Sequence, residues 1–383
     1  MTSPASGPLT GVRVIELAGI GPGPFAAMML ADMGADVIRV DRAGDAGRTR
    51  HPDLLNRGRR SIVVDIKSAE GRDLVLDLVK RSDVLIEGFR PGVTERAGLG
   101  PDDCLAVNPA LVYGRMTGWG QDGPLSSHAG HDIDYLAITG ALHGIGRAGE
   151  RPVPPMNLVG DFGGGSMFLA FGIVCALLTV RAGGPGQVVD AAIVDGVAAL
   201  TTAIHGLRGL GLWRDERGVN LLDGGAPFYD TYECADGRYI AVGALEPKFY
   251  AELVELTGMT GPAADPATHF DPTTWPATRA GWEALFGTRT RDEWTALLEA
   301  SDACVAPVLD WSEAPAHPHM VARETFTTYD GVVQPAPAPR LSVTPGAIQR
   351  PPATPGQHTD EVLAELGRTA DEIAALRETG AVA

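Results

Sequence analysis

The chain has 383 residues, a length that corresponds to two or three domains. Its 31 Lys and Arg residues stand against 48 Asp and Glu residues, which gives a formal net charge of −17. This excess of acid excludes a protein that coats nucleic acid or an anionic membrane, because such binding needs clustered cations. Hydrophobic residues make up 44% of the chain, so we expect a sizeable core and little disorder.

The first half of the chain alternates short β-rich runs with helical segments. Val12–Leu17, Phe25–Met33 and Val37–Asp41 are a predicted strand, helix and strand. The pattern continues with three predicted strands and one predicted helix: Ser61–Asp65, Val84–Glu87 and Leu111–Met116 as strands, and Gly71–Lys80 as the helix. This alternation predicts a doubly wound α/β domain built on a parallel sheet.

The second half is predicted to be more helical and to contain a smaller domain. Apolar stretches predict long buried helices over Met167–Thr179 and Ala192–Leu207. The Asp236-Gly237 pair between two β-rich runs predicts a hairpin. Helical stretches follow near Pro247–Leu256, Trp282–Phe286 and Asp292–Ala300. At the end of the chain, Gly367 ends one short helix and a Thr369–Glu372 capping box begins another.

These elements divide the chain into segments of different character. We expect a large domain over 1–185 that is completed by 330–383, linker helices over 186–224, a small α+β domain over 225–320, and a proline-rich return linker over 321–356.

Neither a metal site nor an export signal is indicated. The four cysteines are far apart, with no CxxC pair that would suggest zinc: Cys104, Cys175, Cys234 and Cys304. The N-terminal segment lacks a basic stretch followed by an apolar one, so a reduced, cytoplasmic location is expected. The uncharged run between Asp161 and Arg181 begins with glycines. Its apolar part of about 14 residues suits a buried core helix better than a membrane span.

The segment Gly21-Pro22-Gly23-Pro24-Phe25-Ala26 has the layout of a dinucleotide-binding fingerprint. It follows a predicted strand, and Asp41 stands about 20 residues further on. A fingerprint works through backbone N–H groups that face the pyrophosphate, and Pro22 and Pro24 have none. A tight strand-to-helix turn is therefore the favoured interpretation.

Residues 39–60 form a basic island in this acidic chain. Its seven arginines are Arg39, Arg42, Arg48, Arg50, Arg57, Arg59 and Arg60, against three aspartates. Because arginine makes bidentate contacts with phosphate, the island favours an anionic, phosphate-bearing ligand. A solvated face with local ion pairs is the alternative.

Three short motifs carry titratable groups, and each has a plain structural alternative. In Gly130-His131-Asp132 a carboxylate can orient the imidazole, although a histidine in a loop is often satisfied by a single hydrogen bond. Asp161 is followed, after one residue, by three glycines. One interpretation of Asp161 is a helix N-cap, and the other is a proton-transfer group beside backbone N–H donors for an oxyanion. Glu246 ends a predicted strand, where an exposed glutamate is usually only solvated.

Together these segments resemble the family III CoA-transferase superfamily over nearly the whole chain. The resemblance is carried by GVRVIELAGIGPGPFAAMMLADMGADVIRVDR, DVLIEGFRPGVTERAGLGP, RMTGWGQDGP and GQHTDEVLAELG. GHDIDY and NLVGDFGGGS are specific to the α-methylacyl-CoA racemase branch. The resemblance implies a large Rossmann-like parallel-sheet domain, a smaller α+β domain and an interlocked homodimer.

The resemblance also implies a site, position by position. His131 and Asp161 match the acid–base pair, and Glu246 and Asn157 match supporting catalytic residues. The matching CoA-binding positions are Arg42, Val64, Asp65, Ile66, Lys67, Gly88, Phe89, Arg90, Arg96, Gly130, Asp132, Ile133, Asp134 and Tyr135.

The implied reaction is inversion of the α-carbon of 2-methylacyl-CoA thioesters, in lipid metabolism, by 1,1-proton transfer through an enolate. Two groups flank the carbon and exchange the roles of acid and base, and no cofactor is needed because CoA is part of the substrate. One alternative is a CoA-transferase with Asp161 as nucleophile, which leaves His131 without a role. Another is a non-catalytic acyl-CoA-binding protein. Residues 200–213 lack the methionines expected of the family's acyl surface, which leaves the acyl chain open.

Overall fold

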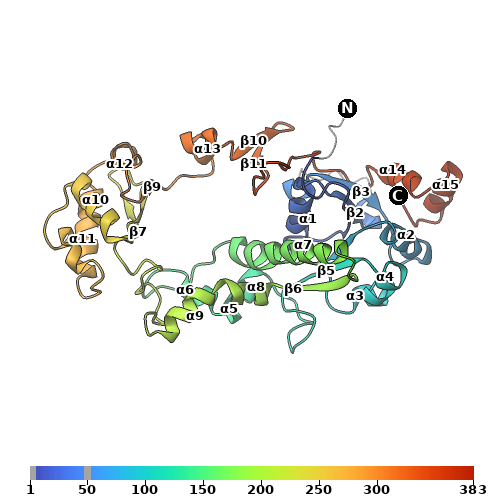
Figure 1. The fold of residues 1–383 in the computed structure, drawn as a ribbon, viewed down its shortest axis with the longest axis horizontal. Coiled ribbons are helices and arrows are strands. Elements are labelled where there is room, and N and C mark those ends of the chain that lie inside the picture. Colours follow the sequence, from blue (N-terminus) through green and yellow to red (C-terminus); the bar gives the residue numbers. More distant parts are fainter. Residues whose placement is uncertain (1–5, 47–52) are drawn as a thin grey trace. The chain divides into compact units, whose positions relative to one another are not determined.

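The computed structural model describes residues 6–46 and 53–383, and it divides into two compact units. The first unit comprises Met1–Thr139, Met156–Leu200 and Ala322–Ala383, and the second comprises Gly140–Pro155 and Thr201–Val321. The segments of both units can be followed by colour in Figure 1. We had expected linker helices over 186–224. Instead, residues 187–192 form a strand of the large sheet, because they pair with the strand that ends at Thr117.

The first unit is built on a six-stranded parallel sheet in the order β3-β2-β1-β4-β5-β6. The strands are β1 (Arg13–Leu17), β2 (Asp36–Asp41), β3 (Arg59–Val63), β4 (Val84–Glu87), β5 (Val112–Thr117) and β6 (Gln187–Ala192). The expected α/β fold with a parallel sheet is confirmed. The order reverses between β1 and β4, and ligands of such sheets bind at the carboxyl ends of the strands near this point.

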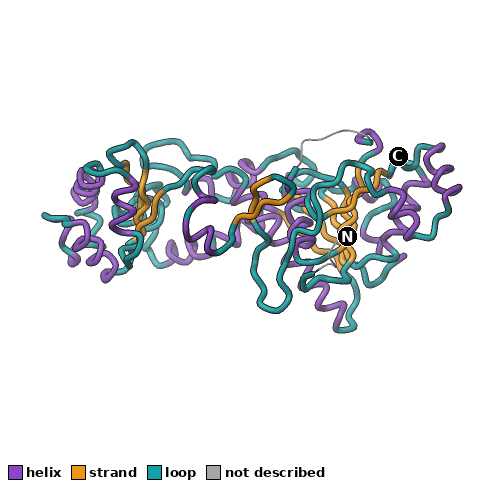
Figure 2. The backbone as a smooth tube through the Cα atoms, turned by 90° about the horizontal axis from the view of Figure 1, so that it is seen from above, coloured by secondary structure: helices purple, strands orange, loops and turns teal. Residues whose placement is uncertain are grey.

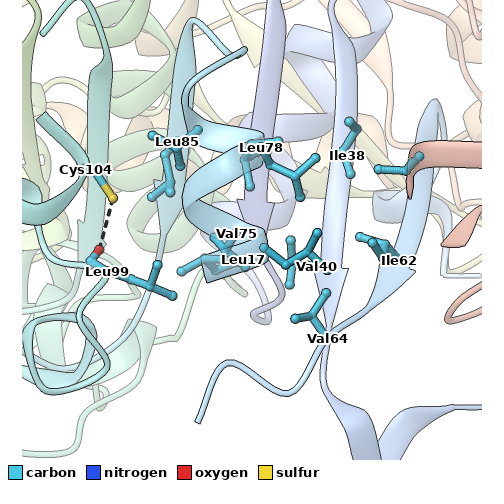
Figure 3. Close-up of a cluster of buried hydrophobic side chains, with 14 of the residues drawn as sticks. Leu17, Ile38, Val40, Ile62, Val64, Val75, Leu78, Leu85, Leu99 and Cys104 are labelled. Atoms are coloured by element: carbon cyan, nitrogen blue, oxygen red, sulfur yellow. Dashed lines mark hydrogen bonds between the residues drawn. The ribbon is translucent and has the colours of Figure 1, made fainter. Parts of the chain in front are cut away.

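One face of the sheet packs against helices from both ends of the chain. These helices are α2 (Ala69–Val79), α4 (Pro101–Val107), α14 (Thr359–Glu365) and α15 (Ala370–Glu378). Figure 3 shows the apolar side chains of strands and helices meeting in this layer, with the Cys104 thiol donating to the Leu99 carbonyl at 3.5 Å. The predicted Thr369–Glu372 capping box is present at the start of α15. The layer therefore depends on the last residues of the chain.

The opposite face carries α1 (Pro22–Asp32) and α7 (Met167–Arg181), which lie side by side (Figure 1). The expected strand-to-helix turn before α1 is present, with Gly21 at a φ of 69°. A π-helix, η3 (Leu158–Ser166), runs directly into α7, and α5 (Asp132–Ile138) and α8 (Ile193–Leu200) pack on it. Figure 2 shows the strands of this unit gathered into one sheet with helices around them.

Helix α7 is only partly the buried core helix that we expected. Its inner side packs on the sheet, but a row of large apolar side chains on its other side is exposed: Met167, Phe168, Phe171, Val174 and Leu178. By length and composition alone, the continuous helix Leu158–Arg181 could cross a membrane, and 44% of its most apolar window is buried. The helix is thus two-sided, and its outer row has no partner within the described chain.

The shorter elements of the first unit connect these layers. They are α3 (Val93–Arg96), the 3₁₀ turns η1 (Ala43–Asp45) and η2 (Leu54–Asn56), and the antiparallel hairpin of β10 (Phe326–Tyr329) and β11 (Val332–Pro335). We had expected residues 321–356 to be an extended linker. Its first part forms this hairpin, because Asp330 and Gly331 adopt the left-handed conformations that a tight turn needs.

The second unit has a small antiparallel sheet in the order β7-β8-β9. Its strands are β7 (Tyr229–Glu233), β8 (Tyr239–Gly243) and β9 (Val305–Pro307), so the hairpin predicted at Asp236-Gly237 is confirmed. Its helices are α6 (Ala141–Gly144), α9 (Thr202–Gly209), α10 (Pro247–Thr257), α11 (Trp275–Phe286) and α12 (Arg291–Leu298), and α13 (Pro318–Ala322) follows where the chain passes back to the first unit. Short 3₁₀ turns are η4 (Pro262–Ala264), η5 (Pro266–Thr268) and η6 (Ala314–Ala316). Aromatic side chains of β7 and the helices form its core.

Candidate active site

A cavity of about 580 Å³ opens at the carboxyl ends of the central strands of the first unit. Its walls come from the residues that follow β1, β2, β4 and β5, including the start of α1. The cavity lies at the reversal of strand order, where the sheet topology predicts a ligand site. This volume is typical of pockets that hold a small organic molecule. The cavity can therefore take one part of a larger substrate.

Both predicted bases line this cavity, although they come from different elements. His131 is the exposed N-cap residue of α5, and its backbone N–H donates to the Asp134 carboxylate at 2.9 Å. Asp161 is half-buried within η3, and the turn at Gly21 leaves room beside it. A Cβ at Gly21 would lie only 3.3 Å from the Asp161 Oδ2 atom. The fold thus brings together two residues that are 30 positions apart.

Two glycines position the loop that carries His131: Gly130, which was a predicted site residue, and Gly118, which sequence reasoning missed. A Cβ on Gly118 would lie 1.9 Å from the Tyr135 ring, and one on Gly130 would lie 2.7 Å from it. The Tyr135 hydroxyl donates to the Gly130 carbonyl at 2.5 Å, and its ring meets Trp119 edge to face. The motif RMTGWG and the motif AGHD, which contains His131, therefore form one packed unit around Tyr135.

Asp161 lies inside a helix, so of the two interpretations given for it the helix N-cap is wrong. The wide turns of η3 begin earlier, where the Phe162 N–H donates to the Asn157 carbonyl at 3.1 Å. The glycines after Asp161 face neighbouring elements, since a Cβ on Gly164 would lie 2.6 Å from Val197. Close packing against α8 explains these glycines, and they do not form the helix start that we expected to supply oxyanion donors.

The surroundings of Asp161 move the pKa of its carboxyl toward neutral pH. Burial raises the pKa of its carboxyl to about 6, and the negative charge of Asp132 acts in the same direction. His131 and a hydrogen bond from the Asn157 side chain lower the pKa. Asn157 thus contacts Asp161, and the supporting role predicted for it stays a prediction. A carboxyl with a pKa near 6 is able to both accept and release a proton at physiological pH.

Comparison with known proteins now identifies the family. The family model of CoA-transferase family III matches residues 9–359. This chain belongs to CoA-transferase family III. It is 46% identical over 369 residues to an α-methylacyl-CoA racemase of Mus musculus, covering 95% of each chain. It is 33% identical to a succinyl-CoA–D-citramalate CoA-transferase of Chloroflexus aurantiacus, covering 97% of each chain. The crystal structure of a CAIB/BAIF family protein from Brucella suis has a TM-score of 0.80 and 28% identity, covering 94% of this chain and 100% of that one.

Part of the predicted CoA-binding set of this family III chain lines the cavity: Arg42, Gly88, Phe89, Arg90, Gly130 and Tyr135. Glu87 fixes the Gly88–Arg90 loop, because its carboxylate accepts the Phe89 N–H at 2.7 Å and pairs with Arg115 at 2.9 Å. Arg42 follows β2 and Arg90 follows β4, so two exposed guanidinium groups stand on either side of β1. This arrangement suits the phosphates of a long anionic ligand.

The remaining predicted CoA-binding positions do not line this cavity: Val64, Asp65, Ile66, Lys67, Arg96, Asp132, Ile133 and Asp134. The segment after β3 instead pairs with the end of the chain, where the Asp65 N–H donates to the Ala381 carbonyl at 2.9 Å. Arg96 is exposed at the end of α3. Their roles toward CoA stay predictions.

Among the described residues, most of the basic island consists of buried ion pairs. Four of its arginines are buried and paired with carboxylates: Arg39 with Asp41 at 2.9 Å, Arg57 with Asp32 at 2.6 Å, Arg59 with Glu16 at 2.5 Å, and Arg60 with Asp36 at 2.7 Å. Arg48 and Arg50 lie outside the described residues. Only Arg42 is an exposed, described member of the island. Most of the island therefore serves to hold the sheet edge together.

The predicted supporting residue Glu246 belongs to the second unit. It is exposed at the N-cap position of α10, in the short connection that follows β8. Its predicted role beside His131 and Asp161 stays a prediction. Within residues 6–46 and 53–383, no group of three or more His, Cys, Asp or Glu side chains is arranged to hold a metal ion.

Proposed function

We propose that this chain inverts the α-carbon of 2-methylacyl-CoA thioesters. The observation that carries the proposal is that His131 and Asp161, from two different elements, line one cavity at the carboxyl ends of the sheet. The relative named as an α-methylacyl-CoA racemase, which is similar over 95% of the chain, supports the same reaction. The arginines at the strand ends offer contacts for the phosphates of CoA.

The proposed reaction moves one proton off the α-carbon and another onto its opposite face. One base takes the proton, and the electron pair moves onto the thioester oxygen to form an enolate. The other group, protonated at the start, then gives its proton to the opposite face, and the thioester is restored with inverted configuration. The raised pKa of Asp161 suits this exchange of roles, because the same carboxyl must act as a base in one direction and as an acid in the other.

We further infer that no cofactor takes part, apart from the CoA that the substrate carries. The reaction exchanges only protons with solvent, so it requires no electron acceptor, electron donor or second substrate.

The experiment that tests the proposal is proton exchange in D2O without any acceptor acid. A pure epimer of a 2-methylacyl-CoA ester is incubated with the protein, and NMR follows both deuterium at Cα and the appearance of the other epimer. We expect both. A protein that incorporates no deuterium, but transfers CoA once a carboxylic acid is added, would be the transferase that uses Asp161 as nucleophile. Binding of the ester with neither reaction would leave only a CoA-ester-binding protein.

We also propose that the working form is a homodimer, as the resemblance implies. The exposed apolar row on α7 supports this, because monomeric soluble proteins seldom leave such a patch uncovered. Phe171, at the centre of this row, is its most exposed member at 70%. It is therefore the residue to substitute in a test of the dimer.

Phe171→Asp is expected to shift the sedimenting species from dimer to monomer and to reduce exchange activity, because it places a charge within an apolar contact. Analytical ultracentrifugation at micromolar concentration measures the change. Asp73→Arg, a charge change on the exposed side of α2, serves as the matched control and should leave the dimer intact. A wild-type protein that sediments as a fully active monomer would overturn the dimer.

A further inference from the structure

The side chain of Asp132 joins the two elements that carry the predicted bases. Asp132 is the first residue of α5 and directly follows His131. Its Oδ1 atom accepts the backbone N–H of Asp161 at 2.7 Å, and its carboxylate also accepts the N–H of Gly160. One half-buried carboxylate thus holds the backbone of one base and lies next to the other along the chain.

The contact requires the glycine that precedes Asp161. A Cβ built on Gly160 would lie 2.1 Å from the Asp132 Oδ1 atom, well inside van der Waals contact. Gly160 is buried, and the atoms that its Cβ would meet all belong to the Asp132 carboxylate, so a larger residue would push this carboxylate away from its backbone donors. The pairing of this glycine with Asp132 is therefore a close backbone approach that any other residue would disturb.

The geometry argues against CoA binding as the task of this side chain. Asp132 does not line the described cavity, and its carboxylate is occupied by two backbone donors. A negative side chain would also repel the phosphates of CoA. We propose that Asp132 is a positioning residue, which fixes the backbone of Asp161 against the start of α5 so that His131 and Asp161 face the same cavity. This inference rests on the function proposed above.

Charge gives the same residue a second effect on Asp161. The negative charge of Asp132 raises the pKa of the Asp161 carboxyl beyond what burial does, while His131 and the Asn157 side chain lower it. Tyr135 also faces this carboxyl from α5. Five other elements pack on η3 and carry titratable or charged groups: α1 has Asp32, which is paired with Arg57, α8 has Asp195, β6 has Asp190, β5 has Tyr113 and Arg115, the latter paired with Glu87, and α7 has Cys175 and Arg181. Removal of the Asp132 charge should therefore lower the pKa of the Asp161 carboxyl.

Asp132→Asn separates charge from hydrogen bonding, because the amide oxygen still accepts the two backbone N–H groups. We expect the pKa of Asp161 to fall by about 0.5–1 pH unit, with kcat at the optimum reduced less than about threefold. Asp132→Ala removes both effects, so kcat should fall by about tenfold or more while KM for the CoA ester stays within about twofold. Asp103→Asn is the matched control, because Asp103 also accepts a backbone N–H, at 3.0 Å from Gly100, but lies away from the cavity.

Two measurements are made on the full-length protein. The first follows the carboxyl carbons of 13C-labelled aspartate by NMR without substrate, with Asp161→Asn to assign the signal. The second follows the pH profile of Cα–deuterium exchange. The NMR titration does not depend on turnover, so a wild type without exchange activity would defeat the proposed function and still leave the role of Asp132 open to test.

Gly160→Ala tests the contact without removing a titratable group. We expect it to lower kcat as Asp132→Ala does, whereas Gly144→Ala, in α6 with open space around its Cβ, should change nothing. The inference is overturned if Asp132→Asn leaves the Asp161 titration unmoved. It is also overturned if Asp132→Ala raises KM with kcat preserved, because that result would assign the side chain to CoA binding.

Discussion

His131→Ala should nearly abolish Cα–deuterium exchange from the epimer whose α-proton faces the imidazole, while exchange from the other epimer persists through Asp161. Asp161→Ala should show the opposite bias. Each variant leaves one face of the α-carbon without its acid or base, so epimerisation, which needs both faces, should collapse in both. A positioned general base contributes about 10²–10⁴-fold, so NMR on each pure epimer will resolve the loss.

The comparison variant is His128→Ala, because His128 is another exposed histidine that lines the same cavity. Circular dichroism and CoA binding establish that each variant is folded and able to bind. A larger loss in His128→Ala than in His131→Ala would transfer the role to His128. Equal loss of exchange from both epimers in both variants would replace one base per face with a single-base mechanism or a coupled pair.

The two directions should also differ in their dependence on pH. Burial and Asp132 raise the pKa of Asp161 to about 6. In the direction where Asp161 is the base, it must start ionised, so the rate should fall about tenfold per unit below that pH. In the reverse direction it must start protonated, so the Asp161 contribution declines above that pH. The same acid limb in both directions would contradict the assignment.

Arg59→Met should lower the free energy of unfolding by about 3–5 kcal/mol, because it leaves Glu16 buried without its charge partner. Both side chains are 1% exposed, and their ion pair is 2.5 Å long. Arg59 also donates to the carbonyls of Leu55 and Pro24, which would lose a partner. Urea denaturation measures the loss. The double variant Glu16→Gln with Arg59→Met should recover part of it, because no uncompensated buried charge remains.

Arg42→Ala is the matched comparison, from the same basic island but exposed beside the cavity. It should change the free energy of unfolding by no more than about 0.5 kcal/mol. It should raise KM for the CoA ester with a smaller effect on kcat, because a remote phosphate contact stabilises ground and transition states alike. If Arg59→Met weakened CoA binding and left stability unchanged, the structural interpretation of the buried arginines would be wrong.

Local signals were sufficient for much of the fold. The predicted strand Val84–Glu87 has the same bounds in the structure, and the Thr369–Glu372 capping box is present. Both depend on neighbours within a few residues: a run of β-branched and apolar side chains, or a cap that closes one turn. The GHD motif and Asp161 were different: by themselves they left a structural alternative open, and only the resemblance to the family III superfamily assigned His131 and Asp161 as the acid–base pair.

Other features depended on partners that are distant in the chain. Gln187–Ala192 is a strand only because it pairs with β5, some 70 residues earlier in the chain. Arg60 is bound by Asp36 and by Glu361 and Glu365 of α14. Composition alone does not show these partners, and for that reason Arg60 resembled a phosphate ligand.

The sequence by itself thus determined the parallel α/β architecture and the second small domain, whereas the roles of the two predicted bases came from the resemblance. Periodicity, capping and turn residues act within a few positions of the chain, so they can be identified from the sequence alone. Only the tertiary structure decided which arginines are buried, that Asp161 lies within a π-helix, and that Asp132 links the two bases. Those properties arise from ion pairs, close glycine contacts and hydrogen bonds between elements, and these form only when distant segments pack together.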